Sequence, residues 1–407
     1  MYKFIENVDA KAHDTFIYNH PLCNLLQTSS WAKIKENWDH QIVGACDENG
    51  ELVASSLVLI KRLPMKMTMM YIPRGPIMDY TNKELIQFYL KSLKKWAKKY
   101  HCLFIKIDPA IHLRDFSLDE KDTPMNQEAK QCIDNIIASG AKHMGYTQYI
   151  AQTIQPRFHM GVAKCDDLDH YIPRATLRSK NVAIRKHVVV EEVGKEGLEE
   201  FAKVMSMTEK RKGVHLRDLE YFQLLMDTYP DNAHLFLAKV NPSIRKNELD
   251  EIINNAKEAL EDPDIGRKQR NKLNEELKHA QDELNSMQEV LEKYHDEEVV
   301  IAGGLMIGYG KVMEMLYAGM DDDFRTFRPQ YLTYLTQFQY AFDHDYDYVT
   351  MGGVEGDLKD GLAMYKSAFN PTVNEFVGEF DIPVNGLLYQ LSELAYKIRK
   401  SKNKHKK

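Results

Sequence analysis

The sequence that decides the fold reads LDEIINNAKEAL from Leu249 to Leu260 and LNEELKHAQDELNSMQEVL from Leu273 to Leu291. In both runs apolar residues recur at alternating steps of four and three, with Glu, Lys, Asn and Gln between them. This spacing places one apolar seam along each of two helices. The segment Asp262-Pro-Asp264 and Gly266 supply a turn between the helices. We therefore predict a two-helix antiparallel arm over residues 243–297 that projects from the main core.

The predicted arm interrupts a β-hairpin, because HLFLAKV (234–240) precedes it and VVIAGGLMIGY (299–309) follows it. A strand at 312–318, a helix near 327–343 and a strand at 347–351 come next. The N-terminal half has the same order: a helix at 30–38, strands at 41–47, 52–60 and 67–72, a helix at 82–100 and a strand at 103–108. We predict an α/β protein with two similar units. Such an order also arises by chance in α/β chains, and that alternative stays open.

The predicted domain boundaries follow from this repeat. Residues 1–150 form the first domain, and the C-terminal segment 386–407 is a candidate to return to it. Residues 151–242 and 298–385 form the second domain, and residues 243–297 form the arm. A chain of 407 residues is long enough for two cores and an extension.

The composition is that of a soluble globular protein, with 43% hydrophobic and 28% charged residues. No apolar stretch approaches the roughly 18 residues that span a bilayer, and the N-terminus has no signal-peptide core. The five cysteines show no metal-binding spacing, so we expect reduced thiols and a cytoplasmic location. The net charge of −6 does not indicate a general affinity for nucleic acid.

Positive charge is nevertheless concentrated in two places. The C-terminal run from Lys397 to Lys407 carries seven fixed positive charges, and a second basic stretch lies between Arg174 and Lys186. Both suit phosphates of RNA or of anionic lipid headgroups. A disordered solubilising tail and a solvated helix face are the alternatives.

Several catalytic classes lack their sequence signatures. The Arg/Gln-x-x-Gly-x-Gly loop that would bind acetyl-CoA is missing, as are phosphate-loop and dinucleotide fingerprints. Neither GxSxG nor HExxH occurs, and no cysteine pairs convincingly with a histidine. We therefore predict no cofactor and no metal, and find no support for nucleophilic catalysis.

Polar residues at predicted strand ends are candidates for ligand contact, because open α/β sheets bind ligands there. Arg74 lies in the turn YIPRGP (71–76), and Asp108 ends the last strand of the first unit. Lys366 follows a glycine-rich segment in a predicted loop before a strand at 376–380. Each also has a plainer interpretation as a salt bridge or a cap.

Two pairs of residues could each place a cation beside an aromatic ring. Lys35 and Trp38 lie three apart and Arg217 and Tyr221 lie four apart, so each pair would share a helix face.

A series of motifs resembles the Fem family of peptidoglycan branching enzymes, closest to the MurM type. In order along the chain they are QTSSWAKIKENW (27–38), YIPRGPIMD (71–79), TIQPR (153–157), EKRKGVHLR (209–217), LYAGM (316–320), MGGVE (351–355) and YKSAFN (365–370). They span nearly the whole chain, and together they are specific.

The resemblance implies two GNAT-like domains and a coiled-coil arm of the kind found in tRNA-dependent members. It also implies a reaction in which alanine or serine passes from Ala-tRNA or Ser-tRNA to the stem-peptide lysine of lipid II, building the interpeptide bridge. The enzyme would then work in the cytoplasm, peripherally at the inner face of the cell membrane. The oligomeric state stays open.

The resemblance also assigns roles to residues. It implies that Lys366 and the preceding Tyr365 act in catalysis. It implies that Lys35, Arg217 and Tyr221 bind the phosphates of the precursor. The full set of predicted substrate-binding residues is Lys35, Trp38, Arg74, Asp108, Arg217, Tyr221 and Tyr317. The general base is either a carboxylate such as Asp108 or the substrate itself.

Three other functions remain open from the sequence. The chain could extend a bridge as a second-step aminoacyltransferase, or aminoacylate a protein N-terminus or another lipid. It could also be a non-catalytic coiled-coil scaffold at the membrane.

Overall fold

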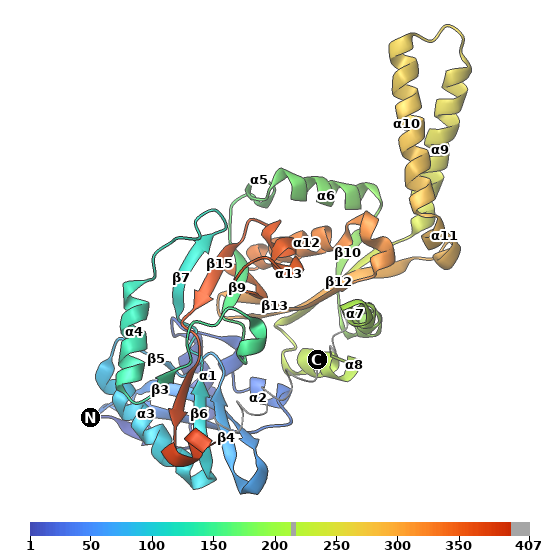
Figure 1. Cartoon of the computed structure of the whole chain (residues 1–407). Coiled ribbons are helices and arrows are strands. Elements are labelled where there is room, and N and C mark those ends of the chain that lie inside the picture. The colour runs from blue at the N-terminus through green and yellow to red at the C-terminus, as the bar shows by residue number, and fades with distance from the viewer. Residues whose placement is uncertain (213–216, 392–407) are drawn as a thin grey trace.

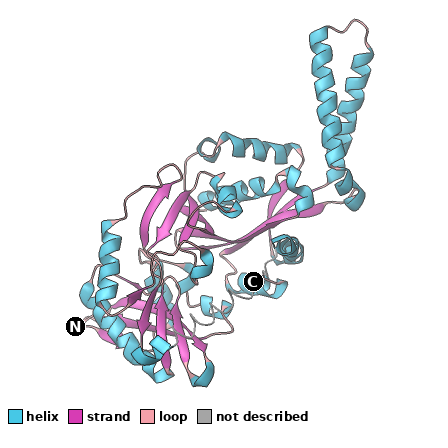
Figure 2. Ribbon diagram, viewed as in Figure 1, coloured by secondary structure: helices cyan, strands magenta, loops and turns pink. Residues whose placement is uncertain are grey.

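Two mixed β-sheets flanked by helices, together with one long helical arm, make up the molecule (Figures 1 and 2). The computed structural model describes residues 1–212 and 217–391. The predicted α/β class with two similar domains and an inserted arm is confirmed. Within the described residues, no helix is long and apolar enough to cross a bilayer.

The first sheet has the order β1-β2-β3-β4-β6-β16-β8, with β5 paired to β3. Neighbouring strands are antiparallel except β4 and β6, which are parallel and are joined through α3 (Lys83–Ala97). The strands are β1 (Lys3–Ile5), β2 (Asp39–Cys46), β3 (Leu52–Arg62), β4 (Thr68–Ile72), β5 (Ile77–Met78), β6 (Cys102–Ile107), β8 (Lys142–His143) and β16 (Phe380–Pro383).

The second sheet repeats this plan in the order β10-β11-β12-β13-β14-β9-β15-β7. Its parallel pair is β13 and β14, joined through α12 (Pro329–Asp343), so the predicted repeat of strands and helix is present. The strands are β7 (His112–Ser117), β9 (Phe158–Ala163), β10 (Val189–Val193), β11 (Ala233–Val240), β12 (Val299–Tyr309), β13 (Val312–Met320), β14 (Tyr348–Val354) and β15 (Thr372–Phe376).

The two domains exchange strands, which corrects the boundary predicted at residue 150. β7 comes from the N-terminal half but pairs with β15 in the second sheet, and β16 returns to the first sheet between β6 and β8. The two crossing segments touch, since the N–H of Val377 donates to the carbonyl of Ile111 at 3.0 Å. Asp108 lies on one of these crossings, which places it between the domains.

The arm consists of α9 (Pro242–Glu261) and α10 (Arg267–Ser286), followed by α11 (Gln288–Tyr294), and it projects away from both sheets (Figure 1). It enters between β11 and β12, whose pairing reaches Val240 and Val299. The seam residues near the base, such as Leu249 and Met287, are fully buried, whereas those near the tip are half-buried.

An ion cluster fixes the base of the arm to α6 (Arg174–Arg185). Arg245 on α9 pairs with Glu283 on α10 at 3.1 Å, and Glu283 also pairs with Lys186 at the end of α6 at 3.4 Å. Because Arg245 and Lys186 are both buried, this joint holds the arm in one direction.

A continuous hydrophobic core joins the two domains. Leu25, Trp31 and Tyr71 from the first domain pack in one cluster with Phe201 on α7 (Leu198–Lys212) and Phe222 on α8 (Leu219–Thr228). The remaining helices are α1 (Ala10–Tyr18), α2 (Trp31–Ile34), α4 (Gln127–Ala138), α5 (Leu168–Tyr171) and α13 (Gly361–Ser367). The same packing positions the end of α2 beside α8.

Candidate active site

Lys35, Arg217, Tyr221 and Tyr317 form one cluster between the domains. The guanidinium carbon of Arg217 lies 4.7 Å from the centre of the Tyr221 ring, so the predicted contact is present. The shared helix face predicted for it is wrong, because α8 begins at Leu219 and Arg217 precedes it. The Tyr317 hydroxyl donates to that of Tyr221 at 3.2 Å. Burial and, second, the charge of Arg217 lower the pKa of Lys35. A half-buried lysine beside the charge of an exposed arginine favours an anion between the two cations.

The predicted pairing of Lys35 with Trp38 is wrong, because α2 ends at Ile34 and the two residues share no helix face. Lys35 lies over the Trp31 ring at 5.4 Å instead. The Trp38 ring is covered by Lys61 at 5.3 Å and lies 6.5 Å from the Tyr71 ring. The Trp38 ring therefore packs against the β3–β4 hairpin.

Asp108 fixes the turn that carries Arg74. Its carboxylate accepts from the Arg74 N–H at 2.7 Å and from the Tyr71 hydroxyl at 2.9 Å. It is 2% exposed, and burial raises the pKa of Asp108 to about 7 although the charge of Arg74 opposes this. With both oxygens engaged inside the protein, Asp108 acts in this structure by positioning Arg74.

The Arg74 side chain crosses to the second domain. It donates to the carbonyl of Pro156 at 2.8 Å and to Nε2 of His159 on β9 at 3.1 Å, and it covers the Phe376 ring at 3.9 Å. Since arginine only donates, His159 Nε2 accepts. Burial first, and then the charges of Arg74 and Lys366, hold the pKa of His159 well below its usual range. His159 is therefore neutral with its proton on Nδ1.

Besides the buried Asp108, Arg74 has a second carboxyl group near it, the half-buried Glu314 on β13. Burial raises the pKa of Glu314 to about 7, against the opposing effect of the Arg74 charge. A carboxyl group with this pKa can accept a proton near neutral pH.

Lys366 lies on α13, which corrects the prediction that it occupies a loop. Asp360 starts this helix by accepting from the N–H groups of Leu362 and Ala363. The Lys366 ammonium is 4% exposed and donates to the carbonyl of Gly353 at 2.9 Å. Its charge reaches His159, so Lys366, His159, Arg74 and Glu314 belong to one electrostatic neighbourhood.

Tyr365 points elsewhere. Its ring packs against Tyr331, Tyr334 and Phe369 at centroid distances of 5.3, 5.5 and 5.5 Å. Burial raises the pKa of the Tyr365 hydroxyl well above its usual range. The structure thus places Tyr365 in the aromatic core below α13, while Lys366 faces the domain boundary.

His159 and Glu314 are the site residues that the sequence reasoning missed. Each is the single acidic or basic side chain in an apolar strand, FHMGVA for His159 and VMEMLYA for Glu314. A lone charged or titratable residue inside a buried strand was the available signal. Among the described residues, no group of three or more His, Cys, Asp or Glu side chains could hold a metal ion.

The model of the FemAB family matches residues 8–397. The chain belongs to the FemAB family. A lipid II:glycine glycyltransferase of Staphylococcus aureus (strain bovine RF122 / ET3-1) is 32% identical over 413 residues, covering 95% of this chain and 94% of that protein. The protein of the same name from strain MSSA476 is 31% identical over 411 residues and has the same coverage.

A solved structure has the same fold as this chain over nearly its whole length. The crystal structure of FemX superimposes with a TM-score of 0.74 at 29% identity, covering 96% of this chain and 99% of that one. Like the named glycyltransferases, this FemAB protein is an aminoacyltransferase.

Proposed function

We propose that this FemAB protein transfers an aminoacyl group from aminoacyl-tRNA to the stem-peptide lysine of lipid II, building the interpeptide bridge. The observation that carries the proposal is the Lys35–Arg217 cluster between the domains. A pyrophosphate with two negative charges matches two adjacent cations and the tyrosine hydroxyls beside them. The acceptor named in the two curated relatives, lipid II, carries such a group.

The reacting groups would meet beside Arg74, His159 and Lys366. The acceptor's amine nitrogen attacks the ester carbonyl carbon, a C–N bond forms and the C–O bond to ribose breaks. Lys366 stabilises the negative charge on the carbonyl oxygen in the tetrahedral state. The aminoacyl ester is already activated, so positioning and charge stabilisation suffice without a protein nucleophile.

Glu314 is the proposed base in this reaction. It takes the proton that the attacking amine loses and, as the carboxylic acid so formed, gives that proton to the departing ribose oxygen. Asp108 is a poorer choice because its oxygens already hold Tyr71 and the Arg74 N–H. The raised pKa of Glu314 matches a group that gains and loses a proton near neutral pH.

The arm and the exposed face of α6 are the proposed tRNA contacts. Arg174, Arg178 and Arg185 on α6 are exposed, whereas Lys180 pairs with Asp169 and Lys186 is buried at the arm joint. Phosphate contacts of this kind make binding fall with salt concentration.

The identity of the donated amino acid distinguishes two candidate activities, transfer of alanine or serine and transfer of glycine. The MurM-type motifs favour alanine or serine, whereas the curated relatives are named glycyltransferases. All three donors therefore belong in the first test.

The deciding experiment supplies tRNA charged with labelled alanine, serine or glycine to lipid II. A parallel acceptor is lipid II already carrying one bridge residue, because a second-step enzyme would use only that. Label on the stem-peptide lysine, absent with uncharged tRNA, supports the proposal. Folded protein that transfers none of the three donors to either acceptor would refute it.

A further inference from the structure

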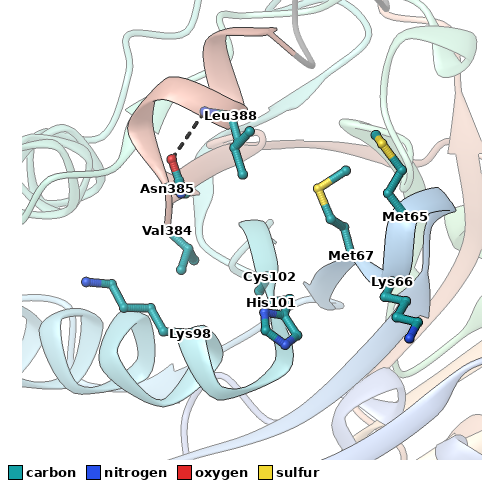
Figure 3. A pocket seen from close by; sticks show the side chains of 9 residues that line it. All are labelled: Met65, Lys66, Met67, Lys98, His101, Cys102, Val384, Asn385 and Leu388. Carbon is teal, nitrogen blue, oxygen red and sulfur yellow. Dashed lines mark hydrogen bonds between the residues drawn. The ribbon is translucent and has the colours of Figure 1, made fainter.

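The β3–β4 hairpin and the segment after β16 lie at the end of the first domain opposite the arm (Figure 1), and both expose apolar side chains. Met65 at the tip of the β3–β4 hairpin is 82% exposed, and Leu387 and Leu391 after β16 are 70% and 54% exposed. Met65 and Leu388 line one pocket of about 750 Å³ (Figure 3), so the hairpin tip and the segment 384–391 form one continuous surface. We call this surface the hairpin face.

The hairpin tip presents its methionine at a conformational cost. Met65 and Lys66 have φ values of 60° and 58°, a region that residues other than glycine and asparagine rarely adopt. The exposed Met65 side chain recovers little of this cost by burial within the described chain. A partner that buries the Met65 side chain would offset this conformational cost.

The C-terminal side of the face is held in place from within. The Tyr389 hydroxyl donates to Asp381 on β16 at 3.0 Å, and its ring lies 5.6 Å from that of Phe104. Because Tyr389 is buried, Leu387 and Leu391, four residues apart, are directed outward.

The charge of the hairpin face is positive. Lys66 and Lys98 line its pocket, and none of the nine lining residues is acidic. The sequence that continues from this face carries seven Lys and Arg residues between 397 and 407, in a chain of net charge −6. Apolar side chains combined with basic ones favour anionic lipid, at roughly 1 kcal/mol per basic residue near the surface. A second copy would bring like charges together.

We propose that the hairpin face is the surface by which this protein docks on an anionic lipid bilayer. The inference rests on the proposed function, because lipid II is held in a membrane. The β3–β4 hairpin connects the two sites: Tyr71 lies six residues from Met65, about 20 Å along a strand. Lys61, whose ammonium covers the Trp38 ring, lies on β3 of the same hairpin. Trp38 is three residues from Lys35 in the chain. Docking here directs the arm away from the membrane.

The test uses full-length protein and flotation with vesicles of phosphatidylglycerol and phosphatidylcholine, or of phosphatidylcholine alone. We expect binding to the anionic vesicles, lowered about tenfold or more in Met65→Glu/Leu387→Glu/Leu391→Glu. Ile137→Glu on α4, 44% exposed, is the matched control and should bind as wild type. A chain ending at Leu391 separates the contribution of the basic run.

Two results would overturn the proposal. One is unchanged vesicle binding by the triple variant. The other is loss of a dimer in sedimentation by the same variant, which would assign the face to a second copy. Transfer to lipid II in detergent micelles keeps the two proposals apart: the triple variant should retain micellar transfer and lose vesicular transfer. If the wild-type protein transfers to lipid II in neither micelles nor vesicles, the proposed function fails. The vesicle-binding comparison still tests the proposed membrane contact of the hairpin face.

Discussion

The guanidinium of Arg74 in the first domain lies 3.1 Å from Nε2 of His159 in the second. The same guanidinium reaches the carbonyl of Pro156 and covers the Phe376 ring. One side chain thus spans the boundary between the domains and sets the spacing of the groups around it. Only the planar fork of arginine can make these contacts together.

Replacing Arg74 by lysine should therefore lower kcat about 10- to 100-fold and reduce the free energy of unfolding by about 2 kcal/mol. Arg62→Lys is a suitable control because Arg62 is exposed and pairs only with Asp39 among the described residues. Transfer rates and thermal unfolding of both variants measure the effect. Wild-type kcat in the Arg74 variant would remove Arg74 from the site.

Lys366→Met should lower kcat by about 10²- to 10³-fold with little change in KM, because the cation acts on charge that develops only in the transition state. Lys366→Arg should restore part of the rate. Lys359→Met, at an exposed position of the same segment, controls for the loss of a charge. Wild-type turnover by folded Lys366→Met would exclude the assigned role.

The pH dependence of transfer tests Glu314. A base must be deprotonated, so with the pKa of Glu314 raised to about 7 the rate should fall as pH drops below about 7. Glu314→Gln should lose this limb along with most of its rate. His159 adds no limb at this pH, since its pKa lies well below the usual range. An unchanged profile in Glu314→Gln would leave the substrate as its own base.

The pH dependence of the free energy of unfolding tests the pKa of Glu314 independently of catalysis. The pKa of Glu314 is about 7 in the folded protein against an ordinary 4.5, so the folded state binds the proton more tightly. The contribution of Glu314 to stability is therefore complete below about pH 4.5 and is lost as pH rises through 7. In chemical unfolding between pH 5 and 8, Glu314→Gln should lose less stability than wild type.

Lys35→Ala and Arg217→Ala should each raise the KM for lipid II about tenfold, with a smaller effect on kcat, because a charge-assisted contact to phosphate is removed. Lys33→Ala, two residues earlier and exposed, controls for the change in α2. Steady-state kinetics at fixed tRNA concentration separate the two constants. A normal KM for lipid II in both variants would remove the phosphates from this cluster.

Shortening the arm tests its partner. Removing residues 256–272 and closing the helices with an Asn-Gly turn keeps the Arg245–Glu283 joint and the buried residues Leu249 and Met287 at the base of the arm. The KM for aminoacyl-tRNA should rise, and the salt dependence of tRNA binding should become less steep. Transfer kinetics with the shortened arm would show an unchanged KM if the arm instead serves a protein partner.

Local patterns predicted much of this fold. The alternating apolar spacing located α9 and α10, and the repeated strand–helix order located α3 and α12 between their strands. Short strands carry too little pattern to show which sheet they join, so the exchange of β7 and β16 was not predictable. The helix predicted at 30–38 was too long, and the Lys35–Trp38 pairing failed with it.

The site was less accessible to sequence reasoning than the fold. Arg217 and Tyr221 are close in sequence, and their predicted contact is present although Arg217 precedes α8 instead of lying on it. His159 and Glu314 gain their significance from Arg74, which is distant in sequence and arrives only through the domain interface. Burial also determines their protonation, and burial is a property of the whole structure.

The exchange of β7 and β16 has a consequence for how the protein is made. The slot between β6 and β8 is filled by residues 380–383, which leave the ribosome only after the strands of both sheets that precede them in the chain. Until then the nascent first domain exposes two unpaired strand edges, which are prone to wrong pairing. Both sheets are therefore completed close together in time, when residues 372–383 emerge. Neither half should be obtainable as a stable fragment by cutting at residue 150.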